Sequence, residues 1–565
     1  MPMPFVVPPP SLALEFQFDF HLIHNPTHVV ALHPLSDGTV KIYTFADVVP
    51  RIHELAFHFY SEVNASSSRK FAARTPIIAI LATFDAFTSF MWPKLQAILR
   101  AGMIAFPISP RFSPLVVAHL IDTVQPTHIL TNHEGRQLTQ KIMDLVQNLV
   151  KPCQLLAPTF REIFTPKHEN PYFPRHSRDL HDIAYVIHSS SSSAMFPKTI
   201  HCSAHFMLKN AEVIGQPFRE CVWDNNIDNQ IDYASESLAG KIFGLQGLEL
   251  FHFVGLAFIN WLARSGFSMA LLNPFDSSSA IPASPQTVFE GLKCTQPSYV
   301  YASPTLIEIW ALDAKITSFL ASVTAVITAG KRLNKGIGDA LVKQGVHINV
   351  AFGSTETGAI SILTPDRGVD WEYFYAPPVP EFQFLRRDDG YYNLVVLSTP
   401  NRTLPVCNTT HDNTSAYDPG DIFMRHPTRN HHYSVIGRSS DQIMLKSGEM
   451  VNPASIEEIL STDEQIKTAL LFGHGQHYLG VLIEPIEAVS CDSLETKKLI
   501  ANIQHTLDEI NATLPSYSRV STQMILVASP DKPILLSPKG QPRRALVLKE
   551  YEEEITSLYL HREIV

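Results

Sequence analysis

Residues 184–200 read AYVIHSSSSSAMFPKTI, and the interpretation of the whole chain depends on this stretch. Its apolar first half predicts a short buried strand. Five serines follow, Ser189 to Ser193, and the stretch closes towards Lys198. Backbone N–H groups and hydroxyls in such a turn can surround a phosphate, and the lysine adds a positive charge. A serine-rich surface linker explains this stretch, taken alone, equally well.

The composition predicts a folded intracellular protein of more than one domain. The chain has 565 residues, of which 45% are hydrophobic and 17% charged, so it can bury large cores. A net charge of -10 without a Lys/Arg run argues against a nucleic-acid partner. The six cysteines form no CxxC pair, which is typical of reduced thiols. With no signal-peptide pattern and no apolar run of about 20 residues, we expect a cytoplasmic protein without a membrane span.

The order of the apolar runs predicts an α/β fold. Strand and helix patterns alternate from Thr75 to about residue 330, which is typical of a parallel sheet covered by helices. After about residue 375 the pattern changes to antiparallel strands and then to a smaller unit. We therefore predict a large N-terminal body of mixed sheets over residues 1–436, a hinge at 437–441, and a small mobile α+β domain over 442–565.

A second stretch, AFGSTETG at residues 351–358, follows a predicted strand. Thr355 could donate a hydrogen bond to a phosphate oxygen, and Glu356 could hold Mg²⁺, a cation that prefers oxygen ligands. The alternative is an ordinary helix start, with Thr355 as the cap and Glu356 in the first turn.

Three further positions carry weaker signals. Asp421 could accept two ribose hydroxyls, although an ordinary turn aspartate is the better interpretation of this residue alone. Arg438 could contact a phosphate or ribose, or form a surface ion pair. Lys539, in the loop LSPKGQPRR, could approach a reacting phosphoryl group, or be solvated surface.

The joint order of these stretches resembles the adenylate-forming superfamily, which includes acyl- and aryl-CoA synthetases, adenylation domains of peptide synthetases, and luciferases. The resemblance spans nearly the whole chain. Residues 100–111 and 537–551 are similar to the fungal peptide-synthetase-like adenylation domains of carboxylate reductases. The resemblance implies that a carboxylate attacks the α-phosphorus of ATP, giving an acyl-adenylate and pyrophosphate. A thiol then takes the acyl group and releases AMP.

The resemblance also implies a role for each motif residue. The ATP phosphates would be held by Ser189, Ser190, Ser191, Ser193 and Lys198. The adenine would be enclosed by Ala329, Gly330, Phe352, Gly353 and Ser354. Thr355 would contact the α-phosphate, Glu356 the Mg²⁺, and Asp421 and Arg438 the ribose. Lys539 would assist adenylate formation, and His252 would border the acid, although a histidine in an apolar run is more often a core residue.

The phosphate stretch departs from the family pattern at Ser192 and Met195, where glycines are usual, and at Ala194, where threonine is usual. Ser440 stands where the hinge aspartate is expected. We predict an active or slowed carboxylate–CoA ligase for an aryl or other apolar acid, with Phe251, Phe253 and Tyr299 near the acid and Glu249 as the one candidate for an ammonium group. Because the chain ends soon after Lys539, the thiol would come from elsewhere. The alternatives are an adenylation domain that serves the phosphopantetheine of a carrier protein in trans, or a non-catalytic relic that binds a nucleotide or acid.

Overall fold

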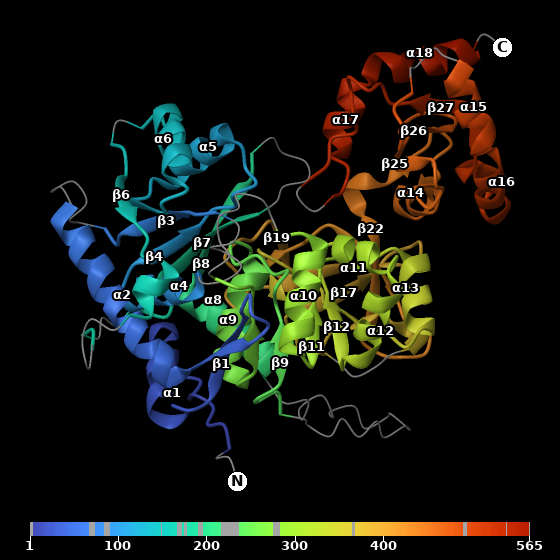
Figure 1. Ribbon diagram of the computed structural model, residues 1–565. Coiled ribbons are helices and arrows are strands. Elements are labelled where there is room, and N and C mark those ends of the chain that lie inside the picture. Colours follow the sequence, from blue (N-terminus) through green and yellow to red (C-terminus); the bar gives the residue numbers. More distant parts are fainter. Residues whose placement is uncertain are drawn as a thin grey trace. The chain divides into compact units, whose positions relative to one another are not determined.

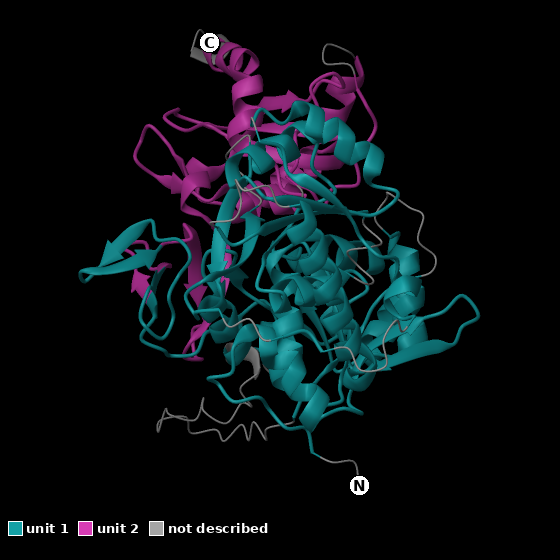
Figure 2. Ribbon diagram, turned by 90° about the vertical axis from the view of Figure 1, so that its left-hand side faces the viewer, with its two compact units in different colours: residues 1–189, 196–383, 395–417 teal, residues 190–195, 384–394, 418–565 magenta. Residues whose placement is uncertain are grey.

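The structure is a computed structural model, and its described residues form two compact units (Figure 2). Unit 1 comprises the described residues within 4–189, 196–383 and 395–417, and unit 2 those within 384–394 and 418–563. The described residues are 4–66, 74–83, 91–148, 150–165, 172–174, 178–189, 196–215, 237–274, 283–363, 368–489, 494–537 and 540–563.

One sheet of unit 1 has the strand order β13-β12-β11-β9-β10-β1-β2 (Figure 1). Its neighbours run parallel as far as β1, and β2 is antiparallel to β1. Every residue of β10 and β12 is buried, as expected of parallel strands covered on both faces. The strands are β1 (Val29–Pro34), β2 (Val40–Thr44), β9 (Ile242–Gly244), β10 (Ser268–Ala270), β11 (Tyr299–Tyr301), β12 (Ala325–Thr328) and β13 (Ile348–Val350).

A second sheet of unit 1 has the order β6-β5-β3-β4-β7-β8. The strands are parallel as far as β7, and β8 turns back antiparallel to β7. From Ile200 to Cys202 the residues of β8 alternate between buried and exposed positions, as in an edge strand with one covered face. The strands are β3 (Ile77–Leu81), β4 (Ile104–Pro107), β5 (His128–Thr131), β6 (Cys153–Leu156), β7 (Ile183–Ser189) and β8 (Lys198–Ser203).

Helices connect successive parallel strands and cover the sheets (Figure 1). Those of unit 1 are η1 (Leu14–Phe16), α1 (Gln17–His24), α2 (Phe45–Ser66), α4 (Met91–Arg100), α5 (Pro114–Val124), α6 (Arg136–Leu145), α7 (Phe160–Ile163), α8 (Ala204–Gly215), α9 (Phe253–Ser265), α10 (Pro285–Thr295), α11 (Pro304–Trp310), α12 (Ala314–Ser322), α13 (Lys335–Lys343) and η3 (Gly368–Asp370). Short strands complete the described part of this unit: β14 (Gly353–Ser354), β15 (Gly358–Ala359), β16 (Phe374–Tyr375), β19 (Thr409–His411) and β20 (Thr414–Tyr417).

Strands β17 (Phe382–Arg386) and β18 (Tyr392–Leu397) each carry residues of both units. Unit 2 continues with β21 (Asp421–Arg425), β22 (His432–Arg438), η4 (Ser439–Asp441), β23 (Ile443–Met444), β24 (Met450–Val451), α14 (Pro453–Leu460), β25 (Ile466–Phe472), β26 (Leu479–Pro485), α15 (Leu494–Asn502), α16 (Gln504–Thr513), η5 (Ser516–Ser518), β27 (Val520–Val527), α17 (Arg544–Glu550) and α18 (Glu552–Glu563).

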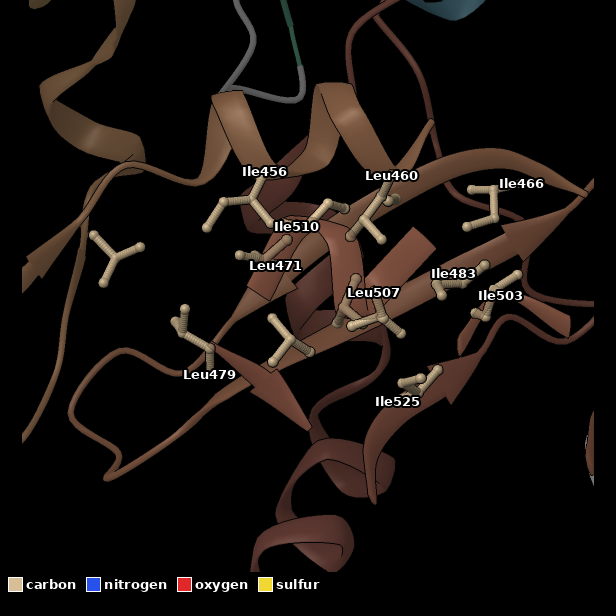
Figure 3. Packing of buried hydrophobic residues seen from close by; sticks show 14 of the residues in the cluster. Ile456, Leu460, Ile466, Leu471, Leu479, Ile483, Ile503, Leu507, Ile510 and Ile525 are labelled. Atoms are coloured by element: carbon tan, nitrogen blue, oxygen red, sulfur yellow. The ribbon is translucent and has the colours of Figure 1, made fainter. Parts of the chain in front are cut away.

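The core of unit 2 is organised by a three-stranded sheet of order β25-β26-β27. Alternate residues of a strand point to opposite faces. Leu471 and Ile483 therefore pack on one face with Ile456 of α14 and Ile510 of α16, as Figure 3 shows. Leu470 and its neighbours Phe472 and Leu482 pack on the other face with residues of α17, among them Val547.

The predicted α/β class is confirmed, with details that the sequence pattern missed. Residues 304–318, whose apolar pattern predicts a single helix, form two helices, α11 and α12, because the Asp313 carboxylate caps α12 by accepting the N–H groups of Lys315 and Ile316. The polar segment 401–420 contains the hairpin β19–β20. Helices α17 and α18 were not predicted. The hinge at 437–441 concerns a movement and stays a prediction.

Candidate active site

Most of the predicted site residues in unit 1 follow the carboxyl ends of parallel strands. Ser189 ends β7, Gly330 lies two residues beyond β12, and Phe352 lies two residues beyond β13. Arg111 follows β4 in the same way. In open α/β sheets, ligands bind in the crevice outside these carboxyl ends. The fold therefore gathers the candidate residues at the edge where a ligand is expected.

The serine loop is framed by the β7–β8 pair. Ser189 and Lys198 are opposite each other in the antiparallel register, and Lys198 is exposed. The ladder thus brings the first hydroxyl and the lysine of the predicted phosphate loop to the two sides of one turn. Ser190, Ser191 and Ser193, together with the substituted glycine positions 192 and 195, lie outside the described residues. The phosphate-binding role of this loop stays a prediction.

The stretch 351–358 does not start a helix, so that alternative is wrong. It forms a tight hairpin in which β14 pairs with β15 and Gly353 lies opposite Ala359. Thr355, Glu356 and Thr357 make the turn. Ser354 Oγ accepts the Thr357 N–H at 3.1 Å, and Thr357 Oγ1 accepts the Ser354 N–H at 3.3 Å. The turn therefore presents Thr355 and Glu356 on a backbone that its own side chains hold.

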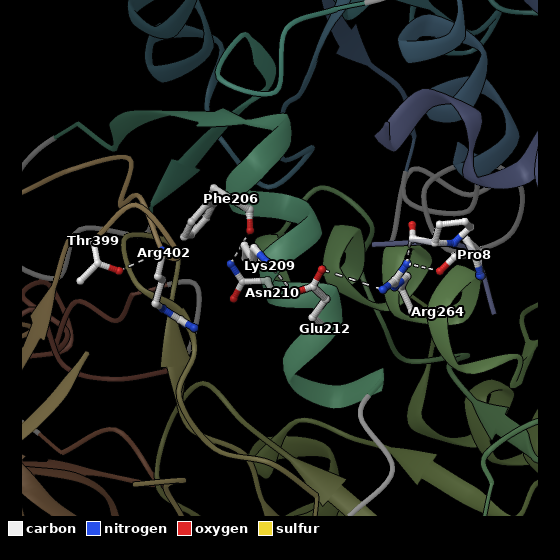
Figure 4. A network of polar contacts seen from close by, with 9 residues as sticks. Pro8, Phe206, Lys209, Asn210, Glu212, Arg264, Thr399 and Arg402 are labelled. Atoms are coloured by element: carbon white, nitrogen blue, oxygen red, sulfur yellow. Dashed lines mark hydrogen bonds and ion pairs between the residues drawn. The ribbon is translucent and has the colours of Figure 1, made fainter. Parts of the chain in front are cut away.

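Two side chains from outside anchor this hairpin. Asn210 of α8 accepts the Ala359 N–H at 2.8 Å and donates to the Phe206 carbonyl at 2.8 Å. Arg402 Nη2 donates to the carbonyl oxygens of Thr357 and Ala359 at 2.8 and 2.7 Å. Figure 4 shows Asn210 on α8, and Arg402 on a separate segment.

Burial lowers the pKa of Arg402 to about 10, despite the opposing effect of the Glu381 carboxylate. Its guanidinium therefore still carries its charge at neutral pH. The same helix α8 is tied towards α9, because Glu212 pairs with Lys209 at 2.9 Å and lies 3.9 Å from Arg264 Nη2 (Figure 4). Arg264 in turn donates to the Pro8 carbonyl at 2.6 Å. The hairpin is thus anchored to a helix that is itself linked to α9 through the Glu212–Arg264 pair.

Glu356 is half-buried and lies close enough to β8 to act on Cys202 electrostatically. Burial raises the pKa of the Cys202 thiol, and the negative charge of Glu356 raises it further. Among the described residues, no group of three or more His, Cys, Asp or Glu side chains is arranged to hold a metal ion. One carboxylate beside a phosphate loop nevertheless fits Mg²⁺, which is usually held by one or two carboxylates together with substrate phosphates.

The predicted adenine residues lie on two adjacent turns of one sheet. Ala329 and Gly330 follow β12, and residues 352–354 follow its neighbour β13. Gly330 has a φ of +97°, a conformation that favours glycine. The Phe352 ring stacks on Phe374 with centroids 5.0 Å apart and planes at 12°. Phe352 and Gly330 thus lie on the turns that follow two adjacent parallel strands.

The predicted acid residues form a polar cluster with Arg111. Arg111 Nε lies 3.1 Å from Glu249 Oε1, and His252 Nε2 lies 3.4 Å from Glu249 Oε2. The side chain of His252 is 31% exposed, so the interpretation as a core histidine is wrong. Burial acts to raise the pKa of Glu249, but hydrogen bonds and charges from His252 and Arg111 outweigh it and lower that pKa. Glu249 is therefore ionised, and its negative charge is compensated by the neighbouring Arg111 and His252.

Aromatic side chains surround this cluster. Phe251 and Phe253 are buried next to His252. Tyr299 begins β11 and stacks on Phe243. Tyr301, at the end of that strand, interacts electrostatically with Glu249. Burial and then the Glu249 charge raise the pKa of Tyr301. Of the two tyrosines of β11, Tyr301 is therefore the one that belongs to the cluster, whereas the prediction from the sequence was Tyr299.

Unit 2 carries the remaining predicted residues. Asp421 of β21 lies opposite Arg438 of β22 in the antiparallel register, with Arg438 Nε 3.4 Å from Asp421 Oδ1. The two predicted ribose ligands are therefore neighbours, and the surface ion pair proposed as the alternative for Arg438 exists. Lys539 lies outside the described residues. The flanks of its loop are closed by a bond from the Ser537 N–H to the Gln541 carbonyl at 2.7 Å.

Three residues that hold segments of the site carried no signal in the sequence. Asn210 lies inside a helix and Arg402 inside a polar segment. His188, which accepts the Ser109 N–H at 3.0 Å, lies at the end of an apolar strand. Each acts through partners far away along the chain, such as Asn210 with Ala359 across 149 positions. A single sequence contains no local pattern that pairs such residues.

Comparison with known proteins decides the family. The model of the AMP-binding enzymes matches residues 92–390, more than half of the chain, and that of the AMP-binding enzyme C-terminal domain matches residues 440–563. The chain belongs to the AMP-binding enzyme family. The predicted adenylate-forming resemblance is thereby confirmed. Asp421 and Arg438 lie between the two matched segments.

Two curated relatives of this AMP-binding enzyme come from fungi. An adenylate-forming reductase of Heterobasidion annosum is 30% identical over 575 residues, covering 98% of this chain and 50% of the relative. A carboxylic acid reductase of Neurospora crassa is 23% identical over 530 residues, covering 92% of this chain and 47% of the relative. The chain thus spans about half the length of the relatives it matches.

Solved structures support the fold of this AMP-binding enzyme. An anthranilate CoA ligase in complex with anthranoyl-AMP superposes with a TM-score of 0.70 at 15% identity, covering 96% of this chain and 98% of that one. A benzoate CoA ligase of Burkholderia xenovorans superposes with a TM-score of 0.67 at 15% identity, covering 95% of this chain and 99% of that one. Identity this low shows the fold and not the substrate. Among the described helices, none is long and apolar enough to cross a membrane.

Proposed function

We propose that the chain activates a small carboxylic acid with ATP and then transfers the acyl group to a thiol. The observation that carries this proposal is the placement of the serine-loop flanks, the Thr355–Glu356 turn and the Glu249–His252 cluster at the carboxyl edges of the sheets of unit 1. The family match supports the same chemistry.

Each side chain has a defined task in this proposal. The carboxylate oxygen of the acid attacks the α-phosphorus, the acid–phosphate bond forms, and pyrophosphate leaves with the electrons of the broken P–O bond. Mg²⁺ held through Glu356 would supply charge compensation for the phosphates. Thr355 would donate to an α-phosphate oxygen, and Lys198 and Lys539 would offset the charge that develops in the transition state. Asp421 and Arg438 would hold the ribose.

The acid is proposed to be apolar or aromatic, because Phe251 and Phe253 pack beside His252. For the thiol, CoA is the first candidate. The phosphopantetheine of a carrier protein in trans is the second, and the similarity to adenylate-forming reductases of about twice the length favours it.

The decisive experiment is ATP–pyrophosphate exchange over aryl, fatty and amino acids, followed by a search for thioester with CoA and with a phosphopantetheinylated carrier. We expect exchange with an apolar acid, and a fall of about a hundredfold or more in Lys539→Ala. Lys549→Ala, a change of an exposed lysine on α17, is the matched control and should leave exchange unchanged. Absence of exchange with every acid, combined with stabilisation by AMP, would instead identify a nucleotide-binding relic.

A further inference from the structure

The turn that follows β4 is held from two sides at the acid cluster. The Ser109 N–H donates to His188 Nε2 at 3.0 Å, and two residues later Arg111 pairs with Glu249. His188 belongs to β7 and Glu249 to the segment between β9 and α9. The histidine therefore links the acid cluster to the strand from which the serine loop starts.

The hydrogen-bond pattern fixes the proton on the His188 ring. Because Nε2 accepts the Ser109 N–H, a neutral ring must carry its proton on Nδ1. The residue is 1% exposed, and burial, with a smaller contribution from the charge of His252, lowers its pKa to about 3. The ring is therefore neutral at pH 7, and its Nδ1–H is a donor.

This donor has no acceptor among the described residues. His188 Nδ1 is fully buried and makes no hydrogen bond there. The ring is surrounded by Phe112, Phe251 and His252, with centroids 4.8, 6.3 and 5.8 Å away. A buried donor without a partner is costly, so a native protein rarely keeps one unless a ligand or water completes it.

We propose that His188 is a substrate-binding residue whose Nδ1–H donates to a carboxylate oxygen of the bound acid. This inference rests on the proposed function and extends it to a residue of β7. His188 directly precedes Ser189, so an acid held there lies next to the loop proposed for the phosphates. The carboxylate would meet a cluster whose negative Glu249 is compensated by Arg111, with His252 as a further neighbour.

Two conservative variants separate the two ring nitrogens of His188. In His188→Gln, the amide oxygen reaches the position of Nε2 and can still accept the Ser109 N–H, but the Nδ1 donor is lost. In His188→Asn, the amide nitrogen occupies the position of Nδ1 and keeps a donor, but the acceptor for Ser109 is lost. His33→Asn is the control. Like His188, His33 is buried and hydrogen-bonded to the backbone, in its case to the Leu272 carbonyl at 2.8 Å.

The measurements are calorimetric affinities for benzoate, anthranilate and ATP, together with urea unfolding. We expect His188→Gln to weaken benzoate or anthranilate binding about tenfold to a hundredfold and to leave ATP affinity within about twofold. His188→Asn should keep most of the acid affinity and lose stability, and His33→Asn should lose stability alone.

Equal weakening of acid and ATP in His188→Gln, or an unchanged acid affinity, would overturn the inference; the second result would indicate that a buried water satisfies Nδ1. Failure of the wild-type protein to bind either acid would overturn it as well. Because these affinities need no turnover, acid binding that depends on His188 in a protein without pyrophosphate exchange would support the inference while the proposed function fails.

Discussion

Two hairpins at the carboxyl edges of unit 1 carry the proposed phosphate contacts, and they are stabilised in different ways. The β7–β8 hairpin is a long antiparallel ladder that extends from Ile183 opposite Ser203 to Ser189 opposite Lys198. The β14–β15 hairpin has two residues in each strand and depends on Asn210 and Arg402. A long ladder fixes the ends of its loop through backbone bonds, whereas a short one needs glycines and side-chain anchors.

The two hairpins also differ in how strictly they require glycine. A Cβ on Gly358 would lie 1.9 Å from Asn210 Oδ1, and one on Gly353 would lie 2.5 Å from the Gly358 carbonyl oxygen. Neither position tolerates a side chain without movement. In the serine loop, by contrast, Ser192 and Met195 replace the glycines usual in the family while the flanking ladder is intact. The anchored hairpin is therefore intolerant of a side chain at its glycines, whereas the serine-rich sequence between β7 and β8 departs from the family pattern at both glycine positions.

The largest expected effect is that of Gly358→Ala. Its φ is +72°, and the new Cβ would displace an Asn210 side chain that is held by two hydrogen bonds. We expect a loss of about 2 to 4 kcal/mol in the free energy of unfolding and loss of pyrophosphate exchange. Urea unfolding and exchange assays measure both.

Gly390→Ala is the matched control for Gly358→Ala. It lies in the turn between β17 and β18 with a φ of +85° and has nothing within 4 Å of the new Cβ. This variant should lose only about 1 kcal/mol in the free energy of unfolding, which is the cost of placing an L-residue at positive φ. Equal effects of the two variants would contradict the anchored hairpin.

The next effect is expected for Glu356→Gln, which removes the carboxylate charge and keeps the size. If Glu356 holds Mg²⁺, exchange should fall about a hundredfold to a thousandfold and need a higher Mg²⁺ concentration. Asp412→Asn is the control, because Asp412 lies between β19 and β20, in a turn with a 93% exposed side chain. An unchanged rate at every Mg²⁺ concentration would remove Glu356 from the proposed metal site.

Acid should act on His188 of the long ladder, whereas residues 353–359 of the short hairpin include no histidine. The His188 pKa is about 3 in the folded protein, against about 6.5 in the unfolded chain, so the unfolded state binds more protons between these values. The contribution of neutral His188 to the free energy of unfolding is therefore complete above pH 6.5, and it falls by up to about 1.4 kcal/mol for each pH unit below that value. Urea unfolding from pH 7 to pH 5 should therefore have a smaller pH slope in His188→Gln than in the wild type, and identical slopes would contradict a neutral His188.

The smallest expected effect is a gain. Replacing Ser192 and Met195 by glycine restores residues that adopt positive φ freely, where an L-residue pays about 1 to 2 kcal/mol. If the loop binds the ATP phosphates, the KM for ATP should fall about fivefold to tenfold. Ser36→Gly, in the exposed turn between β1 and β2, should leave the KM unchanged. A higher KM in the loop variant would show that its present residues are adapted to another role.

Much of the fold was predictable because its signals are local. The continuous apolar runs of β3, β7 and β12 and the helices between them follow from periodicity within short windows. The break between α11 and α12 had a local signal as well, the aspartate cap at position 313, which the helical pattern obscured. The short strands β14 and β15 had no such signal, because two residues have no period.

The sequence by itself determined the α/β class, the family and the order of the candidate site residues. Only the tertiary structure decided that the Thr355–Glu356 segment is a hairpin, that Arg111 compensates Glu249 across 138 positions, and that His188 keeps a buried donor without a partner among the described residues. The physical reason is that periodicity and turn chemistry act over a few residues. Charge compensation and anchoring arise where the carboxyl ends of distant strands meet, which depends on the strand order of the sheets.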